Sequence, residues 1–127
     1  MNPTLFLRRV LAFDALTCLA MGGLLLVAAA PLAGVLAIPR AVLFEAGAIL
    51  VPFALFVLWA MRRAGDSTAP ARAVAAINLA WVAASFALFA LVTPSLLGGL
   101  FVTVQALAVA GIAMLQFHAL ARTRALA

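Results

Sequence analysis

The sequence has few charged residues, one cysteine, one histidine, and neither lysine nor tyrosine. Only 9% of its 127 residues are charged, whereas 69% are apolar, and the mean hydropathy is +1.32. Soluble domains are about half apolar and about one quarter charged, so this composition excludes a water-soluble globule. A lone cysteine, Cys18, excludes a disulfide scaffold, and the chain has no cluster of cysteine and histidine for structural zinc or a dithiol redox pair.

The shortage of polar side chains also means that few groups are available for catalysis. With one histidine, one cysteine and no two carboxylates at similar depth, the sequence offers no nucleophile–base or acid–base pair. It has no phosphate-binding glycine loop and no acidic metal cluster. We therefore expect no enzyme, no metal site and no cofactor; His118 is the only candidate axial ligand for a haem.

All eight basic residues are arginines, and the pI is near 11.8. In a soluble protein such a pI suggests nucleic-acid binding. Here the arginines flank apolar runs, which is typical of membrane proteins. We therefore expect membrane lipids as partners, with arginines near anionic head groups, and no nucleic acid.

Four apolar runs are each long enough for a helix to cross a membrane, which takes about 20 residues. Polar and apolar residues do not alternate in them, so strands are a poor alternative. In lipid every backbone polar group must be bonded within its own segment, which favours helices. The sequence thus predicts an all-α fold, an integral membrane up-down four-helix bundle in a single transmembrane domain over residues 1–127. The expected helices cover residues 10–30, 41–61, 73–92 and 96–121.

Proline, glycine and a few polar residues mark the ends of these helices. Pro31 is expected to end the first helix, which leaves residues 31–39 as a short apolar link in the outer interface. Residues 62–70 form the only hydrophilic loop, and residues 93–99 form the last turn. Such short links make consecutive helices antiparallel neighbours.

The arginines are distributed unequally between the two ends of the predicted bundle. Arg40 alone falls on one side, and the other seven fall on the side that holds both termini. Because short cytoplasmic segments are enriched in arginine, we predict a multi-pass protein of the cell inner (plasma) membrane with both termini cytoplasmic. The seven arginines are Arg8, Arg9, Arg62, Arg63, Arg72, Arg122 and Arg124.

A faint internal repeat relates residues 10–53 to residues 74–117 at an offset of 64 positions, and it places Asp14 opposite Asn78. Shared alanine- and leucine-rich composition explains the matches as well as a duplication does. A true repeat would consist of two helical hairpins related by an axis along the membrane normal. Its best evidence is two matched glycine pairs, Gly34 with Gly98 and Gly47 with Gly111.

Polar residues at a similar depth occur in three of the four predicted helices. Asp14, Asn78, Gln116 and His118 each lie a few residues from a flanking arginine, or roughly 6–9 Å inside the cytoplasmic boundary at the helical rise. They could therefore meet as one polar layer. As a functional site this layer would handle protons or a ligand, with Asp14 as the ionisable group and His118 as its partner.

A purely structural interpretation of the same residues is favoured by their shallow depth. Asp14 would pair with Arg8 or Arg9 near the interface, and the two amide side chains would bond across helices as packing contacts. His118 would then extend to water from an interfacial position.

Glu45 is the acidic residue predicted on the outer side, five positions after Arg40. It could line a vestibule or extend to the membrane surface, and the second is the simpler interpretation. Gln105 and Thr103 lie at a similar depth and are candidate hydrogen-bond partners for it.

Pro52 lies in the middle of the second predicted helix, where it removes one backbone hydrogen bond and frees the carbonyl of Ala48. A helix kink is therefore expected there. Ser85 is a candidate to satisfy the freed carbonyl.

Small residues recur at four-residue spacing, which allows helix backbones to approach closely in lipid. Contacts within the monomer are the first expectation for these ridges, and contacts between copies are the alternative. The ridges are Ala76 with Ala80 and Ala84, Ala106 with Ala110, and Leu107 with Gly111; Gly22-Gly23 has the same role in the first helix.

Taken together, these features resemble small four-helix inner-membrane proteins of bacteria that have no assigned function. The resemblance covers most of the chain and implies the topology and a bacterial inner membrane, without an activity. It is carried by Arg8-Arg9, Asp14, Gly22-Gly23, Pro31-Leu32, Gly47, Pro52-Phe53, Asn78-Leu79-Ala80-Trp81 with Ser85, Gln105-Ala106, and Arg122 with Arg124.

Three hypotheses for the function follow. The first is a non-enzymatic polytopic membrane protein that self-associates or acts as an accessory subunit of a membrane complex, with a homo-oligomer or another membrane protein as partner. The second is a small oligomeric transporter or channel that uses the intramembrane polar layer. The third is a membrane protein that binds a lipid, a quinone or a haem.

Overall fold

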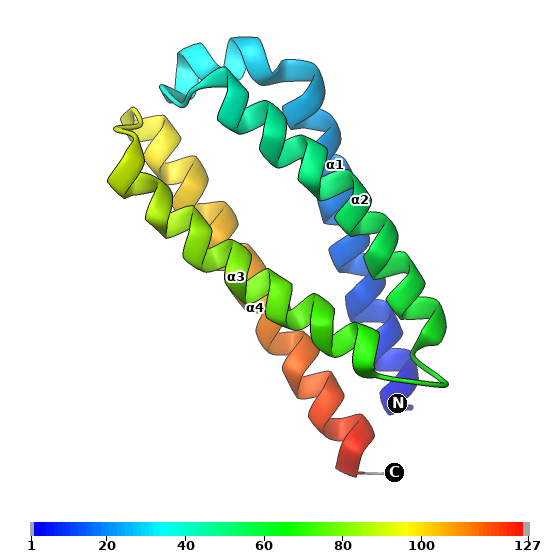
Figure 1. The fold of residues 1–127 in the computed structure, drawn as a ribbon. Coiled ribbons are helices and arrows are strands. Elements are labelled where there is room, and N and C mark those ends of the chain that lie inside the picture. The colour runs from blue at the N-terminus through cyan, green and yellow to red at the C-terminus, as the bar shows by residue number, and fades with distance from the viewer. Residues whose placement is uncertain (1, 126–127) are drawn as a thin grey trace.

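The computed structural model describes residues 2–125, which form four helices joined by short links (Figure 1). All four are long and apolar enough to cross a membrane, so the all-α prediction is confirmed. The helices pair as two antiparallel hairpins, and the chain ends lie with the α2–α3 loop at one end of the molecule (Figure 1). Their bounds are α1 Pro3–Leu36, α2 Arg40–Arg63, α3 Ala69–Leu91 and α4 Leu96–Ala125.

Helix α1 is longer than the sequence predicts at both ends. It begins after Asn2, whose side-chain oxygen accepts a hydrogen bond of 2.8 Å from the Thr4 amide. It continues past Pro31, where it was predicted to stop, and ends at Ala37 in the left-handed conformation (φ 53°, ψ 44°). The expectation that residues 31–36 form a non-helical link is therefore wrong.

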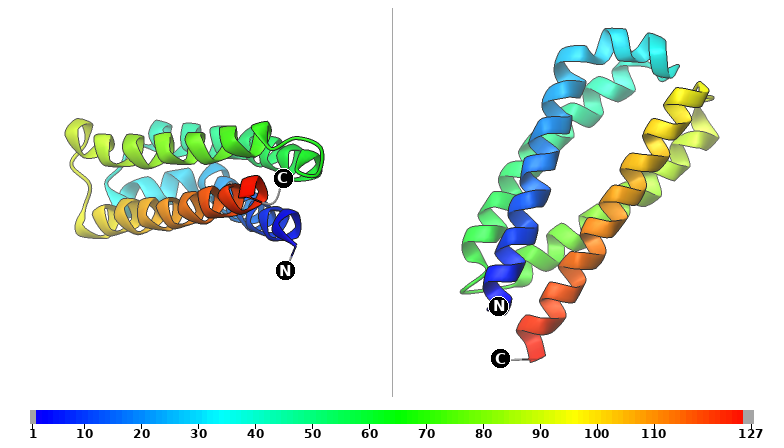
Figure 2. Two further views of the ribbon diagram at one scale, coloured as in Figure 1. Left: turned by 90° about the horizontal axis from the view of Figure 1, so that it is seen from below. Right: turned by 180° about the vertical axis from the view of Figure 1, so that it is seen from behind.

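A kink in α1 lies near the predicted end. Ala28 has non-helical torsions (φ −112°, ψ 19°), three residues before Pro31, and the segment beyond it turns across the end of the molecule (Figures 1 and 2). Proline lacks an amide hydrogen and its ring collides with the carbonyl four residues earlier. Pro31 therefore bends the helix without ending it, because a new helical turn starts directly after the bend.

Helix α2 is continuous from Arg40 to Arg63 with Pro52 inside it, and the kink expected at Pro52 stays a prediction. Pro52 is exposed, and the described hydrogen bonds do not join Ser85 to α2. The Ser85 hydroxyl instead donates to the Trp81 carbonyl of its own helix at 2.8 Å. The predicted bond from Ser85 to the Ala48 carbonyl is therefore wrong.

Two glycines bring α1 and α2 into close contact. A Cβ atom built on Gly47 would lie 2.9 Å from the carbonyl oxygen of Gly22. One built on Gly22 would lie 3.1 Å from the Cβ atom of Leu50 and 3.3 Å from the Gly47 carbonyl oxygen. Any larger residue at Gly22 or Gly47 would push the two helices apart. Small residues allow the same close approach where helices pack in membranes.

The two hairpins are also joined at the end remote from the termini. The Ser95 amide donates to the Leu36 carbonyl at 3.0 Å, and the Ser95 hydroxyl donates to the Val35 carbonyl at 2.9 Å. These bonds satisfy carbonyls in the last turn of α1, which have no partner within the helix. A Cβ atom on Gly98 would collide with the Leu36 carbonyl, so the first turn of α4 needs glycine there.

The glycine pairs that suggested a repeat occupy unlike environments. Gly47 packs against α1 and Gly98 against Leu36, whereas Gly34 and Gly111 have nothing within 4 Å of a built Cβ atom. The matched glycines therefore give the repeat no structural support.

Buried apolar side chains form two clusters along the molecule. One lies toward the termini and includes Leu7, Leu11 and Val57. The other lies toward the opposite end and includes Leu25 and Ile38. The buried polar side chains are those of Asp14, Asn78, Ser85 and Gln116, and they belong to the candidate site.

Candidate functional site

Asp14 of α1, Asn78 of α3 and Gln116 of α4 form a closed ring of hydrogen bonds. Asn78 Nδ2 donates to Asp14 Oδ2 at 2.8 Å and to Gln116 Oε1 at 2.9 Å. Gln116 Nε2 donates to Asp14 Oδ2 at 2.7 Å. The three side chains are only 3%, 3% and 0% exposed, respectively. Three of the four residues predicted to meet in one polar layer are thus brought together.

The carboxylate of Asp14 is bonded by uncharged groups. In addition to the two amides, the Cys18 thiol lies 3.4 Å from Asp14 Oδ1. Arg8, one of the two arginines expected to pair with Asp14, is exposed and donates through Nε to the Met61 carbonyl at 3.3 Å. Arg9, the other, is exposed as well. The two amides therefore bond across helices, as both interpretations allow, whereas the expected pairing of Asp14 with Arg8 or Arg9 is absent from the described hydrogen bonds.

Cys18 is a neighbour of Asp14 that the sequence reasoning left outside the polar layer. The two residues are four positions apart, and side chains at this spacing lie on one face of a helix. The same rule could have identified the contact from the sequence. Thr17, which is adjacent, donates to the Asp14 backbone carbonyl at 2.9 Å.

His118 does not belong to the ring. It is exposed, and its imidazole meets the Phe6 ring edge-on with the centroids 6.4 Å apart. Because residues two positions apart point to different sides of a helix, Gln116 and His118 cannot both face Asp14. The expected partnership of His118 with Asp14 is therefore wrong.

Glu45 lies on the exposed surface of α2, away from the ring. Gln105, which was expected to bond to it, faces α3 instead. Gln105 Oε1 accepts from Trp81 Nε1 at 2.9 Å, and Gln105 Nε2 donates to the Ser85 hydroxyl at 2.9 Å. These bonds form a second polar group, which joins α3 to α4 and which the sequence reasoning missed.

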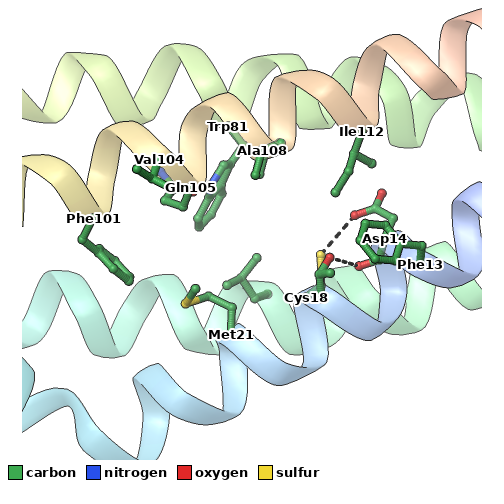
Figure 3. Close-up of a pocket in the computed structure, with 13 residues that line it drawn as sticks. Phe13, Asp14, Cys18, Met21, Trp81, Phe101, Val104, Gln105, Ala108 and Ile112 are labelled. Carbon is green, nitrogen blue, oxygen red and sulfur yellow. Dashed lines mark hydrogen bonds between the residues drawn. The ribbon is translucent and has the colours of Figure 1, made fainter.

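A cavity of about 390 Å³ lies between α1 and α4, and Leu50 of α2 and Trp81 of α3 also line it (Figure 3). Asp14 and Cys18 lie at one end, and Phe101 lies toward the other (Figure 3). The lining is almost entirely apolar. It consists of Phe13, Asp14, Thr17, Cys18, Met21, Leu50, Trp81, Phe101, Val104, Gln105, Ala108, Val109 and Ile112.

The cavity connects the two polar groups. Asp14 belongs to the ring and Gln105 to the second group, and both contribute to its wall. Asp14 is the only acidic residue in the lining, and no basic residue contributes to it. The site is thus an apolar space with one carboxylate at its end.

Comparison of the chain with known protein families, with curated proteins and with solved structures finds no match.

Proposed function

We propose that this protein is a non-enzymatic, multi-pass protein of the bacterial inner membrane that holds a small, largely apolar molecule in the cavity between its hairpins. The observation that carries this proposal is the cavity itself. Its volume of about 390 Å³ is in the range of small-molecule sites, about 300–1,000 Å³. Such sites are mostly apolar with a few convergent polar groups, as this one is.

The membrane and its orientation are part of the same proposal. Two features support it: the length and apolar composition of the four helices, and the gathering of arginines near the end where both termini lie (Figure 1). Since arginine is enriched in cytoplasmic segments, that end faces the cytoplasm. Arg40, the exception, begins α2 at the opposite end.

The cavity lining supports binding over catalysis. Asp14 and Cys18 are its only acidic residue and its only thiol, and His118, the one histidine of the chain, is exposed elsewhere. A nucleophile and a base within hydrogen-bond reach of each other are the usual sign of covalent catalysis. In this cavity the one such pair is the Cys18 thiol with the Asp14 carboxylate. That carboxylate already accepts hydrogen bonds from two amide side chains.

Filling the cavity tests the proposal. Ala108→Trp places a large ring at the cavity wall, and Ala48→Trp places the same ring on the exposed face of α2, outside the lining, as a control. Each protein is purified in mild detergent and titrated with an apolar fluorescent naphthalene probe. We expect saturable binding to the wild type and to Ala48→Trp, and at least about tenfold weaker binding to Ala108→Trp. Equal binding to all three proteins, or none to any, would contradict the proposal.

Self-association is a second candidate function, and the position of one small-residue ridge favours it. Ala76, Ala80 and Ala84 lie on the exposed face of α3, whereas Ala106 is fully buried inside the molecule. Ridges of this type allow two helices in lipid to pack closely. The ridge on α3 is therefore available to a second copy of the chain.

A substitution on this ridge tests the second candidate. Ala80→Leu should raise the fraction of monomer in liposomes, measured by energy transfer between labelled copies. Ala48→Leu, on the exposed face of α2, is the matched control and should leave the energy transfer unchanged. If Ala80→Leu transfers energy as efficiently as the wild type, α3 is not the contact surface.

A further inference from the structure

We propose that the molecule held in the cavity is a lipophilic organic cation, with its positive charge at Asp14 and its apolar body along the cavity wall. This inference rests on the proposed binding function and specifies the chemical class of the ligand.

Asp14 places a carboxylate in an apolar environment. The side chain is 3% exposed, and burial of a carboxylate without an opposite charge is costly. Its hydrogen-bond partners are two amides and a thiol, which donate to the carboxylate but carry no positive charge. A cation in the adjoining cavity would supply the missing charge.

The two carboxylate oxygens of Asp14 differ in how many further hydrogen bonds or ionic contacts they can make. Oδ2 accepts from both amide nitrogens at 2.7 and 2.8 Å. Oδ1 has only the Cys18 thiol at 3.4 Å, and a thiol is a weak donor. Because an ionised carboxylate has about four lone-pair sites, Oδ1 can still interact with a cation, with or without an N–H group. Figure 3 places this carboxylate at the end of the space that the lining residues surround.

The wall of the cavity is rich in aromatic and aliphatic side chains. Phe13, Trp81 and Phe101 contribute aromatic rings to it, and Met21 and Leu50 are among its aliphatic residues. Aromatic faces attract organic cations, tryptophan most strongly, and the attraction increases in a desolvated site. An apolar wall also favours an organic cation over a small hydrated metal ion, because it offers no oxygen ligands to replace water.

A pair of probes with the same shape isolates the contribution of charge. (Naphthylmethyl)trimethylammonium and 1-neopentylnaphthalene differ in one atom, since carbon in the second replaces the charged nitrogen of the first. Binding is measured in detergent by quenching of Trp81 fluorescence, in a Trp59→Phe background that leaves Trp81 as the only tryptophan. We expect the cation to bind at least about tenfold more tightly than its neutral analogue.

Variants then assign the preference to a residue. Asp14→Asn should bring the two affinities to within about twofold of each other and leave the neutral probe unaffected, because the amide keeps the shape without the charge. Asp14→Glu should retain the preference for the cation. Glu45→Gln removes an exposed carboxylate instead and is the control, with no change expected.

The outcomes separate the two proposals. Equal binding of the two probes overturns the cation inference and leaves the binding function standing, whereas binding of neither overturns both. A preference that survives Asp14→Asn, or is lost in Glu45→Gln, overturns the assignment to Asp14. The comparison of probes comes first and needs no substitution of Asp14, so it decides the inference even if Asp14→Asn fails to fold.

Discussion

Asn78 and Asp14 are 64 positions apart in the chain and are joined by a hydrogen bond of 2.8 Å. One residue belongs to the first hairpin and the other to the second. The bond therefore joins the hairpins at a buried polar point, and Gln116 closes it into a ring. Since buried polar groups are costly when their partners are lost, this ring fixes how the hairpins face each other.

Removal of the Asn78 amide should destabilise the fold. Asn78→Leu keeps a similar side-chain size but deprives Asp14 and Gln116 of a partner, so we expect a loss of about 1–3 kcal/mol in the free energy of unfolding. The measurement is equilibrium unfolding in mixed micelles. Ile77→Leu, on the exposed face next to it, is the control and should unfold like the wild type. Equal stabilities for the two variants would show that the ring contributes nothing.

The contact of Gly47 with Gly22 predicts opposite effects for two identical substitutions. In Gly47→Ala the new Cβ atom lies 2.9 Å from the Gly22 carbonyl oxygen, so α1 and α2 must separate, at a cost of about 1–3 kcal/mol. In Gly111→Ala nothing lies within 4 Å, and the helix gains up to about 1 kcal/mol from the better propensity of alanine. Thermal unfolding in detergent compares them; a lower melting temperature for Gly111→Ala than for Gly47→Ala would refute the contact.

The join between Ser95 and Leu36 predicts a local effect at the end remote from the termini. Gly98→Ala places a Cβ atom against the Leu36 carbonyl and should break the hydrogen bond from the Ser95 amide. Amide hydrogen exchange at Ser95 should therefore accelerate by about tenfold or more. In Gly99→Ala the nearest atom to the new Cβ is Phe89 Cε1 at 3.8 Å, so exchange at Ser95 should not change.

The arginine distribution predicts which end of the molecule a membrane-impermeant maleimide can reach in intact cells. Cys18 is buried, so it contributes little background labelling. A cysteine introduced by Val35→Cys should be labelled from outside the cell, because Val35 is 54% exposed at the end remote from the termini. Thr68→Cys, in the α2–α3 loop, should be labelled only after the membrane is disrupted. The reverse pattern would invert the proposed orientation.

The ring was partly predictable because its members follow from simple rules of depth. Asp14, Asn78 and Gln116 are polar residues whose burial in a membrane costs free energy. They lie at a similar distance from flanking arginines, so the sequence predicts that they share one layer. His118 has a similar depth and was included for that reason. Depth does not specify the side of the helix, however. His118 is two positions from Gln116, so it points to a different side of α4, away from the ring.

The effect of Pro31 on α1 was also only partly predictable from the sequence. The sequence predicts a break in the helix at Pro31, and the structure has non-helical torsions at Ala28, three residues earlier. The sequence does not distinguish a helix that ends from a helix that bends, because proline removes the same backbone hydrogen bond in both cases. The outcome depends on the residues beyond the bend, which resume a helix and pack Leu36 and Ile38 into the apolar cluster at that end.

The sequence alone determined the helical class, the apolar spans and the shortage of catalytic groups, because these follow from composition and from the need to satisfy backbone polar groups in lipid. Tertiary structure decided which polar residues meet, which glycines carry helix contacts, and that a cavity lies beside Asp14. A cavity is the space left where side chains from four helices do not fill the volume between them. That volume depends on helix rotation and crossing, which local sequence patterns do not specify.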